Sequence, residues 1–319
     1  MPQANMTPAF IGIDWGSTHR RATLLGADGA PASARSDSEG ALACAGRFRA
    51  SLEALLGDWP EAGGASTVVM AGMVGSAAGW QPVPYLEADT PLSALAHHLV
   101  RIGDAPSGRR CFIVPGYCLH DEQGAVDVMR GEETQLFGAL HHLGPEAADG
   151  CYVLPGTHSK WVRLRQGRIV ELRTYMTGEL FALLSQHGTL ASAMRGPGTA
   201  AGMSDGVDAD RHFLRGVDDA AARPALSHSL FGARARVVTG GLAPANAAAY
   251  VSGLLIGAEW ADAQRLASRD EPVRLIGEPA LARLHALCAA HHGRHFESLD
   301  ARQVQLAAWR ALASESPTS

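Results

Sequence analysis

Two glycine-containing turns, at residues 14–18 and 156–160, have the composition of phosphate-binding loops. Glycine lets a backbone approach an anion closely, and successive amides in such a turn form a concave set of hydrogen-bond donors. We therefore predict that both turns bind nucleotide phosphates. The residues expected to contact the phosphates are Gly16, Ser17 and Thr18 in the first turn and Gly156, Thr157, His158 and Lys160 in the second. Neither turn has the glycine spacing of a P-loop or of a Rossmann fold.

Two side chains add charge to these turns. Asp14 ends the apolar segment before the first turn and can hold Mg²⁺, directly or through water, because magnesium keeps much of its hydration shell. Lys160 is the single lysine of the chain, and it would place a positive charge near a β- or γ-phosphate. Turns of Gly, Ser and Thr are also common in hairpins that bind no ligand, and either turn alone would favour that interpretation.

The segments around the two turns repeat one another, which favours phosphate binding by both. Gly156 lies 140 residues after Gly16, and at this offset the apolar alternation of residues 20–24 matches that of residues 160–164. Each copy reads as strand, glycine turn, strand, tight turn and strand. A repeat of about one domain length is too long for a solenoid and indicates two duplicated α/β lobes.

The remaining elements follow from apolar spacing and from the positions of glycine and proline. We expect helices over residues 42–56, 92–103 and about 131–144, and a strand over residues 236–241. A strand, a glycine turn and a helix are expected over residues 273–291, and a last helix follows near the C-terminus. The pattern is that of a mixed α/β protein.

The bulk composition limits the functions open to the chain. Its 319 residues are 46% hydrophobic with a net charge of −5, so no general attraction to nucleic acid or anionic membrane is expected. The five cysteines form no C-x-x-C pair, which favours a reducing cytoplasm over a disulfide framework or a zinc site. The sequence shows no signal peptide and no apolar run long enough to span a bilayer. We expect a cytoplasmic protein that captures anions locally.

Six collinear motifs carry a resemblance to a known family. They are IDWGSTHRRA (13–22), VMAGMVGSAAGW (69–80), VMRGEETQLFGA (128–139), LPGTHSKWV (154–162), YMTGEL (175–180) and SGLLIGAE (252–259). In this order they closely resemble the 2-dehydro-3-deoxygalactonokinase family of the actin/hexokinase/Hsp70-like ATPase superfamily. The resemblance implies two duplicated ribonuclease-H-like lobes with a cleft between them. We place the lobes at residues 1–134 and 135–297, with a C-terminal helix at about 298–315 returning to the first lobe.

The resemblance also implies a reaction, the ATP-dependent phosphorylation of 2-dehydro-3-deoxy-D-galactonate at its 6-hydroxyl in galactonate breakdown, with Mg²⁺ as the metal. The expected partners are ATP and a small sugar acid, with no nucleic acid and no membrane, and a homodimer is left open. Two positions depart from the superfamily pattern. Pro155 stands where the second phosphate loop usually has an aspartate, and Glu278 and Pro279 follow Gly277 where two small residues are usual. Gly277 and Glu278 are the residues expected beside the adenosine.

Phosphoryl transfer needs aligned oxygens, neutralised phosphate charge and an acceptor for the hydroxyl proton. In related phosphate-handling enzymes a G-x-E-E-like segment carries a catalytic glutamate, so the resemblance favours Glu132 and Glu133 at the start of the expected helix. Carboxylates also suit the positive end of a helix without any catalytic role. We prefer Glu133 as the base, with Glu132 near Mg²⁺ or in a structural role and Asp127 in reserve.

The carboxylate of the substrate calls for an arginine able to make a bidentate contact. Arg130, Arg20 and Arg173 lie beside motif residues, and the sequence does not choose among them. Ser76 and its loop are expected to line the sugar site, although this loop also reads as a packed strand end.

Other functions fit parts of the sequence. A phosphoanhydride hydrolase such as an exopolyphosphatase would use the same turns with water as nucleophile, but it needs a long basic channel and this chain is acidic. A sugar-sensing regulator usually carries a helix-turn-helix ahead of the first lobe, where only about ten residues precede the first strand. A kinase of another sugar acid, including the gluconate-derived epimer, stays open. The sequence favours the sugar-acid kinase.

Overall fold

The computed structural model describes residues 8–103, 105–106, 108–121, 123–195, 206–223 and 225–315. The chain forms two units. The first comprises the residues up to Asp149, residues 164–172 and the segment from Asp300 onward. The second comprises Gly150–Arg163 and Arg173–Leu299. The first unit extends beyond the lobe boundary placed at residue 134, and that boundary stays a prediction.

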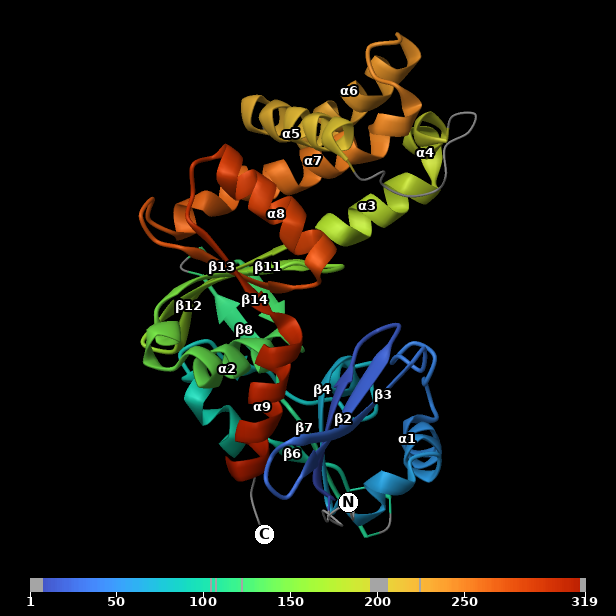
Figure 1. Cartoon of the computed structure of the whole chain (residues 1–319), viewed down its shortest axis with the longest axis vertical. Coiled ribbons are helices and arrows are strands. Elements are labelled where there is room, and N and C mark those ends of the chain that lie inside the picture. Colours follow the sequence, from blue (N-terminus) through green and yellow to red (C-terminus); the bar gives the residue numbers. More distant parts are fainter. Residues whose placement is uncertain are drawn as a thin grey trace, which may run out of the picture. The chain divides into compact units, whose positions relative to one another are not determined.

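The first unit is built on a mixed six-stranded sheet (Figure 1). The strand order is β3 (Pro31–Asp37), β2 (Arg20–Gly26), β1 (Pro8–Trp15), β4 (Thr67–Gly72), β7 (Arg110–Ile113) and β6 (Val100–Arg101). Strand β1 runs antiparallel to β2 and parallel to β4. Because Trp15 pairs with Gly72, the ends of β1 and β4 lie side by side, and both lead into motif loops.

Alternate residues of β1 face opposite sides of this sheet, as the period of a strand requires. Ile11 and Ile13 are fully buried in the core shared with helix α1 (Phe48–Gly57). Gly12 faces the other side and lies under Trp309 of helix α9 (Ala301–Glu315), where a Cβ atom would collide with the indole. The two helices therefore cover opposite faces of the sheet.

A small sheet in the first unit leads to the expected glutamate helix. Its strand order is β5 (Leu86–Glu87), β8 (Tyr117–His120) and β9 (Val126–Met129). Helix α2 (Glu132–Leu143) follows, which confirms the helix start expected near residue 131, and it packs on α9 with Gly138 against Val304. The short 3₁₀ helices in the described part of this unit are η1 (Pro60–Gly64), η2 (Met73–Gly75), η3 (Leu92–His98) and η4 (Pro145–Ala148).

The α-helix expected over residues 92–103 is wrong. Residues Leu92–His98 form the 3₁₀ helix η3, whose turn of three residues still buries Leu92 and Leu95. The chain then enters β6, which pairs antiparallel with β7. The helix expected from residue 42 is observed only from Phe48.

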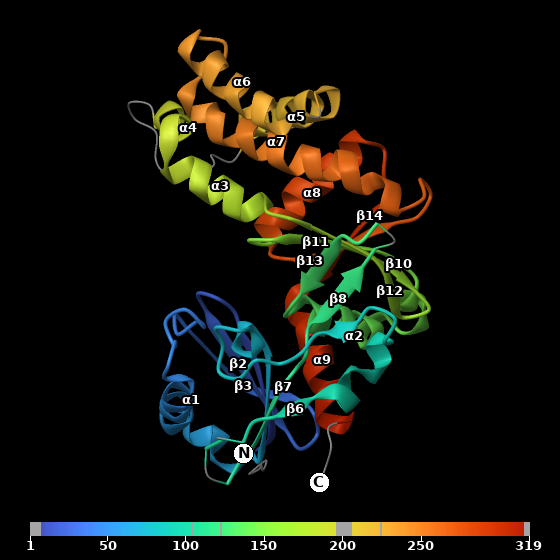
Figure 2. The same ribbon diagram turned by 180° about the vertical axis from the view of Figure 1, so that it is seen from behind.

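The second unit contains most of a five-stranded sheet, of which residues 164–172 belong to the first unit, with helices stacked beyond it (Figure 2). The strand order is β12 (Arg168–Tyr175), β11 (Ser159–Arg165), β10 (Gly150–Leu154), β13 (Val273–Gly277) and β14 (Phe296–Asp300). The helices are α3 (Thr177–Gln186), α4 (Gly188–Met194), α5 (Val207–Ala222), α6 (Leu226–Val238), α7 (Pro244–Ala263), η5 (Gln264–Leu266) and α8 (Pro279–His291). Helices α5 and α7 lie close together because Gly253 meets the backbone of Phe213, where a Cβ atom would not fit.

The strand expected over residues 236–241 is wrong. Helix α6 runs to Val238, and Gly240, with a φ of 78°, makes the turn that follows. The β-branched side chains of Val237 and Val238 favour a strand, but tertiary packing of α6 on α7 overrides that weak preference.

The duplication predicted from the sequence is confirmed. The orders β3-β2-β1-β4 and β12-β11-β10-β13 are the same arrangement of successive strands. In both sheets the first strand pairs parallel with the strand that arrives later, β1 with β4 and β10 with β13. None of the helices in the described ranges combines the length and apolar character needed to cross a bilayer.

Candidate active site

A cavity of about 500 Å³ opens beside the second glycine turn, within the second unit. Apolar side chains of three helices form most of its wall, namely Phe181, Leu255, Ile256, Leu281 and Leu284. The polar residues that line it are Thr157, Ser159, Thr177, Ser252, Glu259, Arg283 and His285. An apolar cavity with a few polar groups is the usual form of a small-molecule site.

The start of helix α3 supports the turn at residues 156–158. Gly178 lies so close to the carbonyl of Gly156 that any side chain there would strike the turn. The amide of Glu179 donates to the carbonyl of Thr157 at 2.9 Å, and His158 Nε2 lies 2.5 Å from Glu179 Oε2. Thr157 and Gly156 line the cavity, whereas the exposed His158 points toward Glu179.

A buried carboxylate joins both sides of this turn. Glu259, on α7 and 1% exposed, accepts hydrogen bonds from Ser159 Oγ and Trp161 Nε1 on one oxygen, each at 2.6 Å. Its other oxygen accepts a bond from Thr177 Oγ1 at 2.6 Å. Glu259 and Thr177 were not predicted as functional residues, although they lie in the motifs SGLLIGAE and YMTGEL. The available signal was a lone acidic residue at the end of an otherwise apolar motif.

The segment expected beside the adenosine lies at the edge of the same cavity. Glu278 immediately precedes α8, and Ala280 and Leu281, from its first turn, line the wall. A Cβ atom on Gly277 would lie 3.0 Å from the ring of Pro155, so one departure from the superfamily pattern, Pro155, lies beside the glycine that precedes the other, Glu278 and Pro279. The end of β10 and the end of β13 thus meet at the turn.

His285 was not foreseen and lies on the wall formed by α8. It is 1% exposed, and its Nδ1 accepts the indole N–H of Trp260 at 3.1 Å. Burial lowers the pKa of this imidazole, which the nearby Glu259 only partly opposes. A neutral ring whose Nδ1 is an acceptor carries its proton on Nε2.

Lys160 takes a different place from the one expected. Its side chain lies in the sheet, 5% exposed, and Nζ donates to Thr174 Oγ1 at 2.9 Å on the neighbouring strand β12. Lys160 is not among the residues that line the cavity.

The first glycine turn lies in the first unit, beyond the end of β1. Ser17 and Thr18 are exposed, and the amides of Ala41 and Leu42 donate to the carbonyls of Gly16 and Ser17. The turn is therefore held from one side by a neighbouring backbone segment. Its outward face is open to solvent.

Asp14 stands at the base of this turn with its side chain 35% exposed. Surrounding protein raises the pKa of its carboxyl, and Arg21, at 3.4 Å, opposes the rise. Asp14 Oδ1 would lie 3.7 Å from a Cβ atom on Gly72, and Gly72 in turn lies against Gly131. Asp14, the end of β4 and the start of α2 therefore meet in one place.

Glu133 is fully buried at the start of α2. Its Oε2 accepts the amide of Gly131 at 2.6 Å, and Thr134 Oγ1 donates to its Oε1 at 3.3 Å. Burial, with a smaller contribution from the like charge of Glu132, raises the pKa of Glu133 to about 8. Glu132 is partly exposed and accepts the amide of Arg130 at 3.1 Å. The reserve candidate Asp127 lies on β9, where it accepts the amide of Val128 at 2.8 Å.

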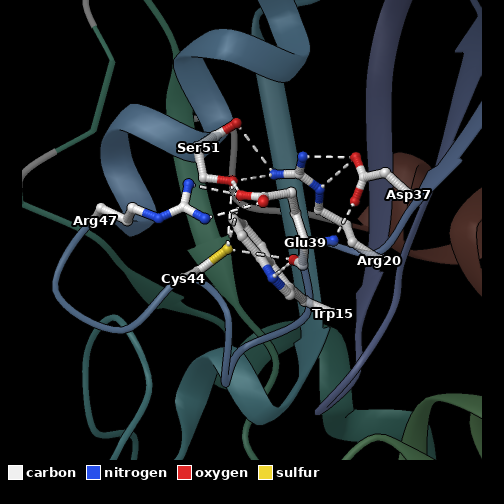
Figure 3. Close-up of polar contacts among 7 residues, drawn as sticks. All are labelled: Trp15, Arg20, Asp37, Glu39, Cys44, Arg47 and Ser51. Atoms are coloured by element: carbon white, nitrogen blue, oxygen red, sulfur yellow. Dashed lines mark hydrogen bonds and ion pairs between the residues drawn. The ribbon is translucent and has the colours of Figure 1, made fainter.

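Two of the three candidate arginines are already bound to aspartates. Arg20 is buried, donates to Asp37 at 2.7 Å, and donates to the hydroxyl of Ser51 at 2.9 Å (Figure 3). Arg173 pairs with Asp262 at 2.8 Å on α7. The Arg20 guanidinium uses Nε, Nη1 and Nη2 for its contacts, and Arg173 uses Nη1.

Arg130 differs from the other two arginines. One nitrogen, Nη2, donates to the carbonyl of Val83 at 2.7 Å, and the guanidinium lies over the ring of Tyr85. Its Nε and Nη1 are buried and have no hydrogen-bond partner among the described residues. Nη1 lies against Gly75, in the loop that also carries Ser76. A buried donor without an acceptor points to a ligand that supplies one.

The duplicated strand order, with a glycine turn after the first strand of each copy, is the fold of the actin/hexokinase-like ATPases. A family model described as 2-keto-3-deoxy-galactonokinase matches residues 14–312. The chain therefore belongs to the 2-keto-3-deoxy-galactonokinase family.

Individual relatives agree with this membership. A 2-dehydro-3-deoxygalactonokinase from Escherichia coli (strain K12) is 37% identical over 278 residues, which cover 86% of this chain and 87% of the relative. A relative of the same enzyme name from Rhizobium meliloti (strain 1021) is 35% identical and covers 95% of this chain and 96% of its own. The crystal structure of a protein assigned as a 2-dehydro-3-deoxygalactonokinase from Sinorhizobium meliloti matches with a TM-score of 0.82 and 33% identity, over 95% of this chain and 98% of that one.

Proposed function

We propose that the protein transfers the γ-phosphoryl group of ATP to the 6-hydroxyl of 2-dehydro-3-deoxy-D-galactonate. Membership of the family and the names of its relatives support this reaction. The single observation that carries the proposal is the apolar cavity beside the turn at residues 156–158. Its size and its few polar groups suit a nucleotide.

The second unit is proposed to bind the nucleotide. The adenine ring of ATP lies against the apolar wall of α7 and α8, next to Gly277 and Glu278. The phosphates lie at Gly156 and Thr157. The start of α3 supports this turn, and the amino end of a helix favours anions. Lys160 takes no direct part, because its ammonium is bonded to Thr174 inside the sheet.

The first unit is proposed to supply the catalytic base, Glu133. Glu133 accepts the proton of the 6-hydroxyl, and a pKa of about 8 gives its carboxylate more basicity than that of an ordinary glutamate. The amide of Gly131 holds the accepting oxygen in place. The negative charge of Glu132 contributes to the raised pKa of Glu133.

Arg130 is proposed to bind the carboxylate of the sugar acid. Its unpartnered Nε and Nη1 lie on different edges of the guanidinium, and either one, together with the second N–H of Nη2, can form the two parallel hydrogen bonds that a carboxylate accepts. The loop with Gly75 and Ser76 lies beside Nη1 and would line the sugar site.

Asp14 is proposed to hold the magnesium that accompanies ATP. No group of three or more His, Cys, Asp or Glu able to hold a metal is found among the described residues. Magnesium bound to a nucleotide needs only one or two carboxylates, because water and phosphate oxygens complete its shell. A carboxylate that is 35% exposed at the end of β1 fits that need. Bound magnesium neutralises charge on the phosphoryl group in transfer.

We also propose the cytoplasm as the place of action, because all five cysteines are free, buried thiols of the kind that a reducing compartment maintains. The proposed partners are ATP and the sugar acid.

The test is an ATP-consumption assay over 2-keto-3-deoxy sugar acids, neutral hexoses and water alone, with the phosphorylated carbon located by NMR. We expect turnover with the galactonate-derived acid and phosphate on carbon 6. Turnover with hexoses but no keto acid would refute the substrate, and rapid hydrolysis without any acceptor would instead indicate a phosphoanhydride hydrolase. Faster turnover with the gluconate-derived epimer would reassign the preferred substrate.

A further inference from the structure

Glu259 is a buried carboxylate without a cationic partner. It is 1% exposed, and no ion pair to it exists among the described residues. Its hydrogen bonds come from two hydroxyls and an indole, all neutral. Burying a carboxylate is costly unless several good hydrogen bonds replace its water. Such a group calls for an explanation beyond packing.

The three donors flank the proposed phosphate turn. Ser159 is the first residue after the turn and begins β11, and Trp161 follows two residues later on the same strand. Thr177 begins α3, whose next residue, Gly178, lies against Gly156. A carboxylate from α7 thus fixes the strand that leaves the turn and the helix that supports it, across 100 residues of sequence from Ser159.

We propose that Glu259 is a positioning residue for ATP, which holds the turn at residues 156–158 and the start of α3 in the arrangement that binds phosphates. The inference deepens the proposed function and rests on it. Glu259 acts through Ser159 and Thr177 and does not transfer a proton. Because Ser159 and Thr177 contact separate oxygens, the carboxylate sets the spacing between the two segments.

The same helix provides a matched control. Asp262 lies one turn further along α7 and also accepts three side-chain hydrogen bonds, from Arg173, Tyr175 and Arg265. It ties α7 to the end of β12 but does not line the cavity. Loss of either carboxylate removes an anchor between α7 and the sheet, and only Glu259 also anchors the turn.

The test compares Glu259→Leu, Glu259→Gln and Asp262→Asn in the full-length protein by calorimetric binding of Mg·ATP and of adenosine. We expect Glu259→Leu to weaken Mg·ATP binding about 10- to 100-fold, since a misplaced binding group costs up to about this much. Adenosine binding should change less than about threefold, because the apolar wall remains. Glutamine keeps an oxygen for Ser159 and Trp161, so Glu259→Gln should recover most of the loss. Asp262→Asn should leave the ratio of the two affinities unchanged.

Amide hydrogen exchange gives a second measurement that a folding defect does not imitate. The amide of Glu179, bonded to Thr157, should exchange faster in Glu259→Leu and in Thr177→Val than in Asp262→Asn. If Glu259→Leu does not fold, Thr177→Val still decides the matter through the same affinity ratio. Equal weakening of both ligands, or unchanged Mg·ATP affinity, would overturn the positioning role. If the wild-type protein binds neither ligand, the proposed function fails first, and this inference fails with it.

Discussion

The turn at residues 14–18 and the turn at residues 156–160 occupy equivalent places in two sheets of the same strand order, but they are supported differently. Around the first lies a partly exposed network of ion pairs, in which Arg20 binds Asp37 and Arg47 binds Glu39 (Figure 3). Around the second lies a buried carboxylate with neutral donors beside an apolar cavity. The first turn is surrounded by partly exposed charged residues, and the second lies beside an apolar cavity.

The perturbed groups divide in the same way. Asp14 and Glu133, whose pKa values are both raised by burial, and the unpartnered donors of Arg130 belong to the first unit. The cavity belongs to the second. Under the proposed function, the two copies divide the work: the first supplies the catalytic base, the substrate arginine and the magnesium ligand, and the second supplies the cavity for the nucleotide. Each prediction below tests this division.

The largest effect is expected for Glu133→Gln. Removal of the base should lower kcat by roughly 10²- to 10⁴-fold. Affinity for Mg·ATP should stay within about twofold, because the nucleotide cavity lies in the other unit. Steady-state kinetics and calorimetry measure the two quantities. A large loss in Asp127→Asn, with little in Glu133→Gln, would transfer the role of base to Asp127.

Next is Arg130→Met, which should raise KM for the sugar acid about 10- to 100-fold, the usual effect of losing hydrogen bonds to a charged group. The KM for ATP should stay nearly unchanged. Arg130→Lys should recover little, because an ammonium lacks the planar fork. Arg173→Met is the control, since its guanidinium is bound to Asp262. A KM effect in the control but not in Arg130→Met would exchange their roles.

Gly178→Ala should disturb the nucleotide side alone. A Cβ atom there meets the backbone of Gly156 and Thr157, so the turn must shift, and we expect affinity for Mg·ATP to fall about tenfold. The matched control is Gly232→Ala in α6, where a Cβ atom meets nothing within 4 Å. Equal ATP affinity in both variants would show that the turn does not bind the phosphates.

The pH dependence of kcat/KM should follow the titration of Glu133 in the first unit. With Glu133 titrating at about 8, kcat/KM should rise with pH up to that region. Glu132→Gln should move this limb to lower pH, because the like charge of Glu132 is one cause of the raised pKa, although burial is the larger one. A limb that stays in place would remove Glu132 from this role.

The free energy of unfolding should change with pH in the opposite direction to kcat/KM. Below the ordinary value of 4.5 Glu133 is protonated in both states, and from there to about 8 the unfolded chain loses its proton first. The wild-type protein should therefore lose stability relative to Glu133→Gln across this window, and the difference should level off above it. Thermal unfolding at several pH values measures the difference in Tm.

The smallest effect is expected for Arg47→Ala. Its ion pair with Glu39 is 2.7 Å long, but both side chains are well exposed, at 49% and 35%. Exposed pairs contribute little and are screened by salt. We expect kcat and the affinity for ATP to stay within about twofold. A tenfold loss of either would mean that the network of Figure 3 takes part in the reaction.

Much of the fold was predictable because its signals are local. The apolar alternation of residues 20–24 and 160–164, the glycine turns and the 140-residue offset can all be seen in one sequence. The errors fall where local signals are ambiguous. Leu92 and Leu95 satisfy a 3₁₀ turn as well as an α-helix, and the valines before Thr239 end a helix that packing holds.

The site was less predictable because its decisive features are partnerships. Arg20, Arg130 and Arg173 look alike in sequence, and they separate only when their acceptors are known. The sequence places Lys160 in a glycine turn. In the structure its side chain lies in the sheet, where Nζ donates to Thr174. Glu259 reaches Ser159 from 100 residues away, and no spacing rule finds such a contact.

The contact between Gly12 and Trp309 has a consequence for biosynthesis. Strand β1 is covered on one face by helix α9, so that face stays exposed until residues 301–315 have left the ribosome. A nascent chain that ends before Ala301 would leave Phe10 without its aromatic neighbour Trp309. The first unit is therefore completed only after helix α9 has been synthesised.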